Sequence, residues 1–315
     1  NGDVIWTGWD NASEGYKIYL YDALSATHSP ITGNLPSSEG DYAKQINDNG
    51  DIVWAALDIT DYDSEIYLYA GPAASVIPLT TNTTDDNGPK ISDNGNVVWH
   101  GADQVDYDYE IFLYDAAAGA TRQITNNATA DYKPDINSNG DLVWEGTDTI
   151  EFDSEIYFYD ASSGNTIQIT SNSLNDYNPR ISNNGDIVWQ SFDYATYDYD
   201  IYLFVASENS IIRLTDNTTY DNEPLINATG DVTWYSYNSI SYDYEIYLYT
   251  ASTGVIQLTD NNTYDYNPRI SDNGNVVWQG DGIDYNSDIY LYDASTGMTR
   301  IISSITDYDY NQDIN

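Results

Sequence analysis

The sequence predicts an all-β fold, a seven-bladed β-propeller built from four-stranded antiparallel blades. Three observations lead to this prediction. A short motif, first written NGDVIW, recurs seven times at nearly constant spacing. Every copy contains four short strand-like runs, and no stretch has the helical period of hydrophobic residues. A period of this length is typical of a unit that buries its hydrophobic face only by stacking on copies of itself.

The repeats cover the whole chain, so we expect a single domain. Successive motif starts lie 48, 45, 45, 45, 45 and 44 residues apart, and 43 residues remain after the last start. The seven repeats are residues 1–48, 49–93, 94–138, 139–183, 184–228, 229–272 and 273–315.

The second copy shows the four expected strands in order. Residues 51–55 (DIVWA) are β-branched and aromatic, and residues 65–69 (EIYLY) alternate aliphatic residues with tyrosine. Residues 76–80 (VIPLT) and 89–92 (PKIS) are the third and fourth runs. Asn-Gly turns such as DNG at 93–95 separate the runs, which favours hairpins.

The order D-x-x-P-x-I-S, D-N-G-x-V-V-W, E-I-Y-L-Y-D, Q-L-T resembles the TolB-like propeller repeat, a relative in shape of the WD-repeat propellers. The resemblance implies that P-x-I-S is the innermost strand A, the Trp run strand B, EIYLY strand C and QLT the outer strand D. The chain departs from the pattern at Lys44 and Gln312, which stand at the Pro position. The family includes transport accessory proteins, surface proteins and propellers appended to hydrolases, so the resemblance implies a fold more than a function.

The phase of the repeats predicts how the propeller closes. The chain starts at the turn between strands A and B, and residues 313–315 (DIN) match residues 135–137 of strand A in another copy. We therefore expect the C-terminal strand A to pair with the N-terminal strand B, which hides the sheet edges without a disulfide. The chain has no cysteine.

Composition indicates a setting outside the cytoplasm. The 51 acidic and 9 basic residues give a net charge of -42, which excludes nucleic-acid partners because they require a basic surface. No apolar run approaches membrane-spanning length, so membrane insertion is not expected. The first residue is not Met, and we expect a secreted or cell-surface protein, with the periplasm as the alternative.

The repeated tryptophans are predicted to pack inside the blades and not to stack on sugars, because both faces of strand B meet neighbouring blades. An aspartate three places before the Pro position recurs in every copy, and two interpretations stand. It forms an acidic ring at the mouth of the channel that binds a cation, or it accepts backbone hydrogen bonds where the chain enters strand A. Lys90, Arg180 and Arg269 follow the Pro position and are expected to neutralise part of such a ring. The aspartates are Asp41, Asp86, Asp131, Asp176, Asp221, Asp265 and Asp309.

A second acidic pattern lies between strands B and C in copies two, three, four and seven. Clustered oxygen ligands suit Ca²⁺, so this ion is the candidate cofactor, with a solvated acidic face as the alternative. No organic cofactor is expected. The candidate ligands are Asp58, Asp61, Asp63, Glu65, Asp103, Asp106, Asp108, Glu110, Asp148, Glu151, Asp153, Glu155, Asp281, Asp284 and Asp288.

Four Asn-x-Thr sequons share one place in the linker between strands D and A, which favours glycosylation there. They are Asn82, Asn127, Asn217 and Asn261.

Catalysis has little support, since His28 and His100 are the only histidines and neither recurs in the repeats. We therefore expect a non-enzymatic extracellular module with a structural or adhesive role, a repeating subunit of a surface layer or fibre. Its partners are expected to be further copies, other surface proteins or glycans. The alternative is a Ca²⁺-dependent propeller that binds carbohydrate or protein, as a lectin or a periplasmic interaction module does.

Overall fold

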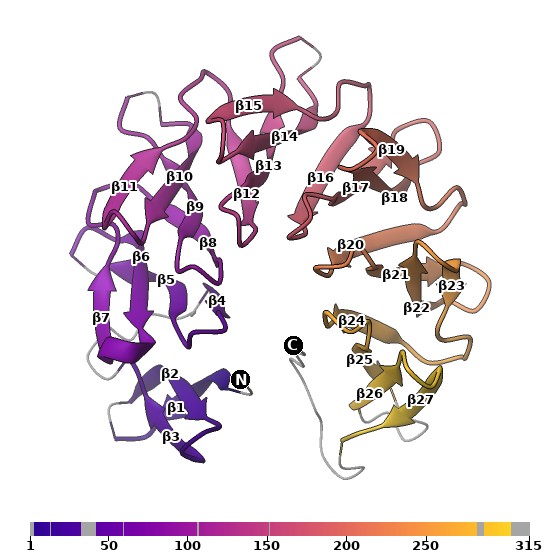
Figure 1. Cartoon of the computed structure of the whole chain (residues 1–315), viewed down its shortest axis with the longest axis horizontal. Helices are drawn as coiled ribbons and strands as arrows, with labels where there is room; N and C mark the ends of the chain where they lie inside the picture. Colours follow the sequence, from indigo (N-terminus) through magenta and orange to yellow (C-terminus); the bar gives the residue numbers. More distant parts are fainter. Residues whose placement is uncertain are drawn as a thin grey trace. The chain divides into compact units, whose positions relative to one another are not determined.

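The computed structural model describes residues 3–12, 14–32, 42–58, 60–105, 107–150, 152–281 and 287–303. Their elements are 27 β-strands and one short 3-10 helix, with no α-helix in this part of the chain. The strands form one three-stranded and six four-stranded meanders, in which neighbours in sequence are neighbours in the sheet (Figure 1). The predicted all-β fold of successive antiparallel propeller blades is confirmed.

The chain divides into two compact units. Unit 1 comprises Asn1–Ile150 and Phe158–Ile167, and unit 2 comprises Glu151–Tyr157 and Gln168–Asn315. The strands up to the boundary, with the helix η1 (Gly71–Ala73), are β1 (Val4–Asp10), β2 (Gly15–Asp22), β3 (Thr27–Pro30), β4 (Tyr42–Ile46), β5 (Ile52–Asp58), β6 (Asp63–Ala70), β7 (Ser75–Pro78), β8 (Asp86–Ile91), β9 (Val97–Ala102), β10 (Tyr109–Asp115), β11 (Ala120–Gln123), β12 (Asp131–Ile136) and β13 (Leu142–Thr147). The strands β14 (Ser154–Asp160) and β15 (Asn165–Gln168) cross it.

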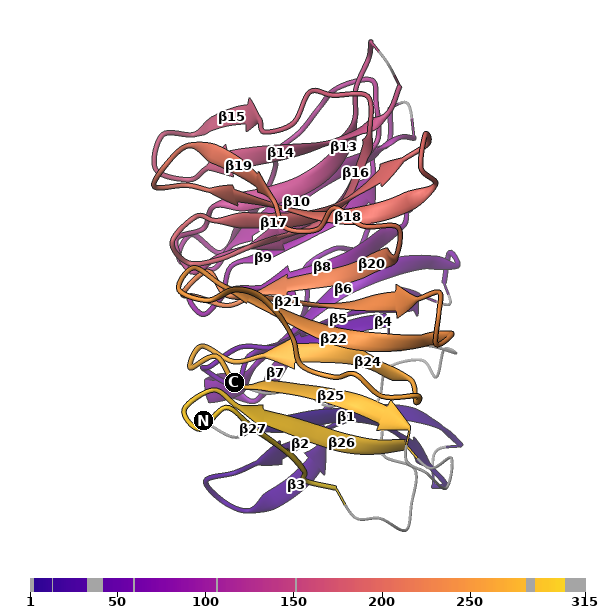
Figure 2. The ribbon, with the colours of Figure 1, turned by 90° about the vertical axis from the view of Figure 1, so that its right-hand side faces the viewer.

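Unit 2 contains three complete sheets, β16 to β19, β20 to β23 and β24 to β27. The last two lie side by side (Figure 2), and β20, β21 and β22 all contact β24. The strands are β16 (Asn175–Ile181), β17 (Ile187–Asp193), β18 (Asp198–Val205), β19 (Ser210–Arg213), β20 (Tyr220–Ile226), β21 (Val232–Asn238), β22 (Asp243–Thr250), β23 (Gly254–Gln257), β24 (Asp265–Ile270), β25 (Val276–Asp281), β26 (Ser287–Asp293) and β27 (Met298–Ile301).

The hydrophobic core lies between successive sheets. In unit 1, Ile66 and Leu68 of β6 pack with Trp99 of the next sheet, whereas Tyr67 of β6 packs on the opposite side, against Trp54. Alternation along strand C therefore serves two interfaces. Six of the seven repeated tryptophans are at most 1% exposed, and Trp6 is 37% exposed. Each full burial stabilises the fold by roughly 2–3 kcal/mol.

The first strand of each four-stranded sheet begins earlier than the sequence suggests. In the second copy, the predicted run at 89–92 is the end of β8, which starts at Asp86. A register shift separates Asn87 from Lys90 in its pairing with β9, and Gly88 adopts a positive φ of 63° there. The bulge accommodates Pro89, which has no N–H to donate to a regular ladder.

The predicted closure falls outside the described residues. The first sheet contains the three strands β1, β2 and β3, and the strand A expected to complete it belongs to residues 309–315. No helix in the described ranges has the length and hydrophobicity needed to cross a membrane.

Candidate functional site

Five of the seven repeated aspartates are buried inside the sheets. Asp86 is 2% exposed, and its Oδ1 accepts a hydrogen bond from Trp99 Nε1 at 2.9 Å while its Oδ2 accepts one from Asn82 Nδ2. This favours the interpretation of the aspartate as a structural acceptor, although the donors are side chains and not backbone N–H groups. The same tryptophan-to-aspartate bond joins Trp144 to Asp131, Trp189 to Asp176, Trp234 to Asp221 and Trp278 to Asp265.

Asp41 and Asp309 of the predicted acidic ring lie outside the described residues. Of the basic residues expected to neutralise the ring, Arg180 and Arg269 donate to the carbonyl oxygen of the proline just before them. Burial raises the pKa of Asp86 to about 6 and that of Asp265 to about 7. These carboxyls therefore titrate close to neutral pH.

The four predicted glycosylation sites belong to the same hydrogen-bonded motif as these aspartates. Asn127 Nδ2 donates to Asp131 Oδ2 at 2.8 Å, and Asn127 Oδ1 accepts from both the backbone N–H and the hydroxyl of Thr129 at 2.7 Å. Asn172 makes the same bond to Asp176, although it is not in a sequon. The recurring Asn and Thr therefore have a structural reason, and glycosylation stays a prediction. Asn82, Asn217 and Asn261 repeat the arrangement.

The first acid of three candidate calcium loops, those of copies two, three and four, caps the turn between strands B and C. Asp58 Oδ1 accepts the backbone N–H of Thr60 at 2.8 Å, and Asp103 and Asp148 make the same bond two residues ahead. We number the sheets in chain order as blades one to seven, so that blade two is β4 to β7 and blade six is β20 to β23. In blade six, the neutral Asn238 caps Ile240 in the same way. The turn therefore requires an oxygen acceptor and not a negative charge.

The third position of the loop is a buried aspartate in blades two, four, five and six. In blades five and six, Thr196 and Ser241 donate their hydroxyl hydrogens to Asp198 and Asp243. In blade two the partner position is Asp61, and burial together with this neighbouring carboxyl raises the pKa of Asp63 to about 6.

The fourth position is a buried glutamate in four blades. Glu110 is 0% exposed, and its Oε1 accepts the backbone N–H of Asn127 at 2.7 Å while its Oε2 has no hydrogen-bond partner. Burial raises the pKa of Glu65 and Glu155 to about 7. Glu155 and Glu245 accept the backbone N–H groups of Asn172 and Asn261 as Glu110 accepts that of Asn127, so these three glutamates hold the linker between strands D and A in place.

Within the described part of the chain, no three acidic, histidine or cysteine side chains form a group that could hold a metal ion. The structure instead gives most of the described acids a capping or hydrogen-bonding role. Asp106, Glu151 and Asp284 lie outside the described residues, so calcium binding stays a prediction.

The tips of the same turns carry exposed aromatic side chains that we did not single out in the sequence. Each adopts a positive φ between 58° and 66°, a backbone conformation that is unfavourable for a bulky residue. Each is between 66% and 77% exposed. The repeated Tyr-Asp or Phe-Asp pair before strand C was the available signal. The residues are Tyr62, Tyr107, Phe152, Tyr197 and Tyr242.

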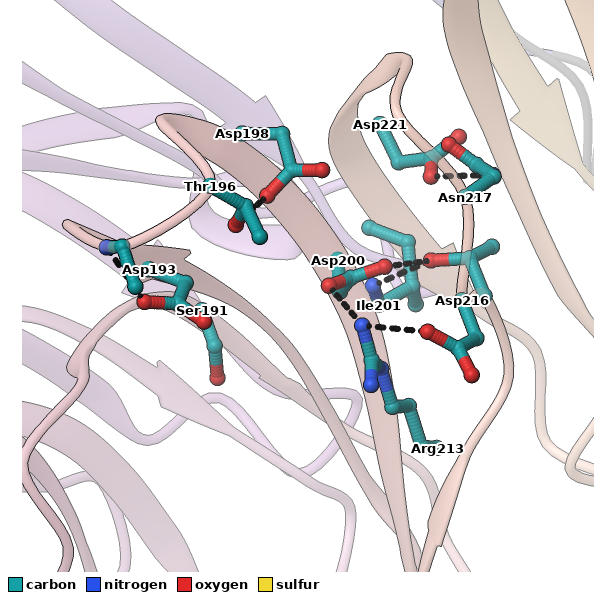
Figure 3. A network of polar contacts seen from close by, with 12 residues as sticks. Ser191, Asp193, Thr196, Asp198, Asp200, Ile201, Arg213, Asp216, Asn217 and Asp221 are labelled. Carbon is teal, nitrogen blue, oxygen red and sulfur yellow. Dashed lines mark hydrogen bonds and ion pairs between the residues drawn. The ribbon is translucent and has the colours of Figure 1, made fainter.

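Blade five departs from the others at the start of strand C (Figure 3). Asp200 replaces the usual glutamate, and Arg213 of β19 donates to Asp200 Oδ2 at 2.6 Å and pairs with Asp216 at 2.9 Å. Thr215 Oγ1 donates to the other oxygen of Asp200. The charge of Arg213 is thus already compensated within its own blade.

Neither histidine belongs to a catalytic arrangement in the described residues. His100 lies between the rings of Tyr109 and Tyr132, and its Nδ1 has no hydrogen-bond partner. Burial lowers the pKa of His100 to about 4. His28 is exposed and contacts the ring of Trp6.

No protein-family model and no curated protein sequence matches this chain. Solved structures match its fold. Dipeptidyl peptidase 4 from Porphyromonas gingivalis is 13% identical with a TM-score of 0.65, and the match covers 95% of this chain and 51% of that one. The β-propeller domain of the Trilobed protease from Pyrococcus furiosus, described as having an open velcro topology, is 10% identical with a TM-score of 0.65, over 98% and 94% of the two chains. TolB from Acinetobacter baumannii is 16% identical with a TM-score of 0.51, over 97% and 80%.

These similarities show the β-propeller fold, and membership of a TolB-like family has only weak support from them. The chain spans about half the length of the dipeptidyl peptidase. Five further similar structures are also peptidases or a hydrolase. The expected role as a structural or adhesive module is therefore wrong, because the similar structures are mostly peptidases and none of those named here is a surface-layer or fibre protein.

Proposed function

We propose that this chain is the propeller part of a peptidase, without catalytic residues of its own, and that it acts together with a separate catalytic part. The observation that supports the proposal is the likeness of nearly the whole chain to peptidases, some of them about twice as long as the match. The isolated histidines support the non-catalytic role. The charge of -42 suits a solvent-facing protein in a cation-rich medium, which supports a location outside the cytoplasm.

The test is to isolate the native polypeptide that carries this chain with an antibody against it and to measure hydrolysis of fluorogenic peptides. We expect the native material to cleave peptides and the purified 315-residue chain to cleave none. An isolate made with a non-binding antibody is the control. Native material that contains the chain and shows no hydrolysis above this control contradicts the proposal.

A further inference from the structure

Blades five and six differ from blades two and four at three neighbouring positions. In blade two, the backbone N–H of Ser64 donates to Asp85 Oδ1 at 3.0 Å, and in blade four that of Ser154 donates to Asn175 Oδ1 at 3.1 Å. These polar links join the start of strand C to the residue before the repeated aspartate. At the corresponding positions, blade five has Tyr199 and Tyr220, and blade six has Tyr244 and Tyr264. A third aromatic residue, on strand B opposite the start of strand C, is Phe192 in blade five and Tyr237 in blade six.

The aromatic residues form two packed clusters within unit 2. In the first, the ring of Phe192 lies 4.8 Å from that of Tyr199, which lies 6.3 Å from Tyr220, and Tyr194 and Tyr197 pack edge-on against Phe192. The second cluster is Tyr235, Tyr237, Tyr244 and Tyr264, in which Tyr244 contacts the other three at 5.2 to 5.9 Å.

Both clusters reach the surface. Tyr194 and Tyr197 are 59% and 66% exposed, and Tyr220 and Tyr264 are 43% and 45% exposed. Exposed aromatic residues that gather in contact with one another, and recur in two adjacent blades, mark an interaction surface more often than a chance exposure. Because none of the three positions carries an aromatic ring in blades two and four, the fold itself does not require rings there.

The electrostatic surroundings favour a cationic occupant. Between Arg180 and Arg269 the chain has thirteen acidic residues and one basic residue, Arg213, whose charge is paired with Asp200 and Asp216. Burial raises the pKa of Tyr199 and Tyr237. The phenols therefore stay neutral, and their faces attract cations in a negative field. The same field repels anionic lipids and a second copy of this chain.

We propose that the two aromatic clusters bind the lysine and arginine side chains of an extended basic peptide. This inference rests on the proposed function, since it names the class of peptide that the propeller presents to the catalytic part. Each cation lies on tyrosine faces, and the nearby carboxylates compensate its charge.

The test measures binding of a fluorescein-labelled peptide of alternating arginine and alanine by anisotropy, in about 0.1 M NaCl to screen long-range attraction. A peptide of alternating glutamine and alanine is the neutral probe. The variant Tyr199→Ser/Tyr220→Asn copies the polar link of blade four, and Tyr244→Ser/Tyr264→Asn does so in the next blade. Both variants keep the net charge. We expect each to bind the arginine peptide about tenfold more weakly, and the glutamine peptide to bind weakly to all proteins.

Tyr62→Ser is the matched control, because it removes an exposed tyrosine from unit 1. It should bind the arginine peptide as the parent does. Equal affinity of the parent and both double variants overturns the proposal, as does an equal loss in Tyr62→Ser. Tight binding of a neutral glycan without binding of the arginine peptide also overturns it.

Hydrogen exchange of the parent protein gives an answer that does not depend on the folding of the variants. The arginine peptide should protect residues 192–199 and 237–244 and leave the equivalent residues 57–64 unchanged. Absence of protection at the first two segments overturns the proposal. The peptidase proposal is tested separately, by hydrolysis in the native material. If the chain does not bind the arginine peptide but the native material cleaves peptides, this inference fails while the proposed function stands.

Discussion

At the scale of single residues, the blades depend on a buried hydrogen bond between side chains thirteen residues apart. The indole of Trp99 fills the space between sheets and donates to Asp86, which also receives the amide of Asn82. A buried acceptor that loses its donor destabilises the fold by about 1–3 kcal/mol.

Trp99→Phe should therefore lower the free energy of unfolding by about 3 kcal/mol or more, because it leaves a cavity as well as an acceptor without its donor. Urea unfolding followed by circular dichroism measures the change. Trp6→Phe is the control, since Trp6 is 37% exposed, and it should cost less than about 1 kcal/mol. Equal costs for the two substitutions would show that the bond to Asp86 contributes nothing.

At the scale of elements, the turns between strands B and C combine a capping acceptor, a buried acid and an exposed ring in a strained conformation. The strain is local to the turn and affects each of five blades. A substitution that removes the strain from one turn should therefore have a measurable effect on its own.

Tyr62→Gly should keep or raise the melting temperature, because glycine adopts the φ of 66° without the cost that a tyrosine bears. The gain is expected to be up to about 1 kcal/mol. Thr60→Gly, in the same turn at a residue without positive φ, should lower the melting temperature. Scanning calorimetry compares the two, and a larger loss for Tyr62→Gly would contradict the strain argument.

The calcium prediction is tested on the same turn. Millimolar Ca²⁺ should raise the melting temperature of the parent if the acids bind it, because a ligand of the folded state stabilises that state. Asp61→Ser copies the neutral partner of Asp243 and should reduce the gain. A melting temperature that Ca²⁺ leaves unchanged in the parent rules out binding by these turns.

The sequence predicts the strands because every copy repeats the same alternation. An ambiguous strand assignment in one copy can therefore be resolved by comparison with the other six. It does not predict that Asp86 bonds to Trp99, since that contact depends on the register that pairs Asp86 with Gly101, two residues from Trp99 on strand B. The acids were interpreted as ligands because their spacing suggests clustering, whereas Asp58 and Glu110 each serve a different backbone N–H. The clusters around Tyr199 and Tyr244 appear only as differences between copies, which a search for shared motifs overlooks.

At the scale of the whole molecule, the net charge of -42 combines with many buried carboxyls whose pKa is raised. Asp86, Asp131 and Asp221 have pKa values of about 6, and Glu65 and Asp265 of about 7, against ordinary values of 3.8 for Asp and 4.5 for Glu. Desolvation by burial is the largest cause in each. At a pH between the ordinary pKa values and the raised ones, the folded chain binds more protons than the unfolded chain.

The free energy of unfolding should therefore fall as the pH rises from about 4 to about 7. We expect a higher melting temperature at pH 5 than at pH 8, measured by calorimetry. Repeating the comparison in about 1 M NaCl screens the repulsion between surface charges, so the difference that persists reports the buried groups. Asp22, Asp58, Asp160 and Asp293, whose pKa values are lowered, oppose this trend only at more acidic pH. A melting temperature in high salt that is equal or higher at pH 8 would contradict the assignment.

The Asn-x-Thr-x-Asp arrangement at the entry to strand A has a consequence for inferring glycoproteins from sequence. Three hydrogen bonds account for an asparagine and a threonine at the spacing that an oligosaccharyltransferase recognises, whether or not that enzyme ever meets the chain. In repeats of this kind, conservation of the tripeptide across a lineage measures the need to fold. Only the attached sugar itself reports the modification.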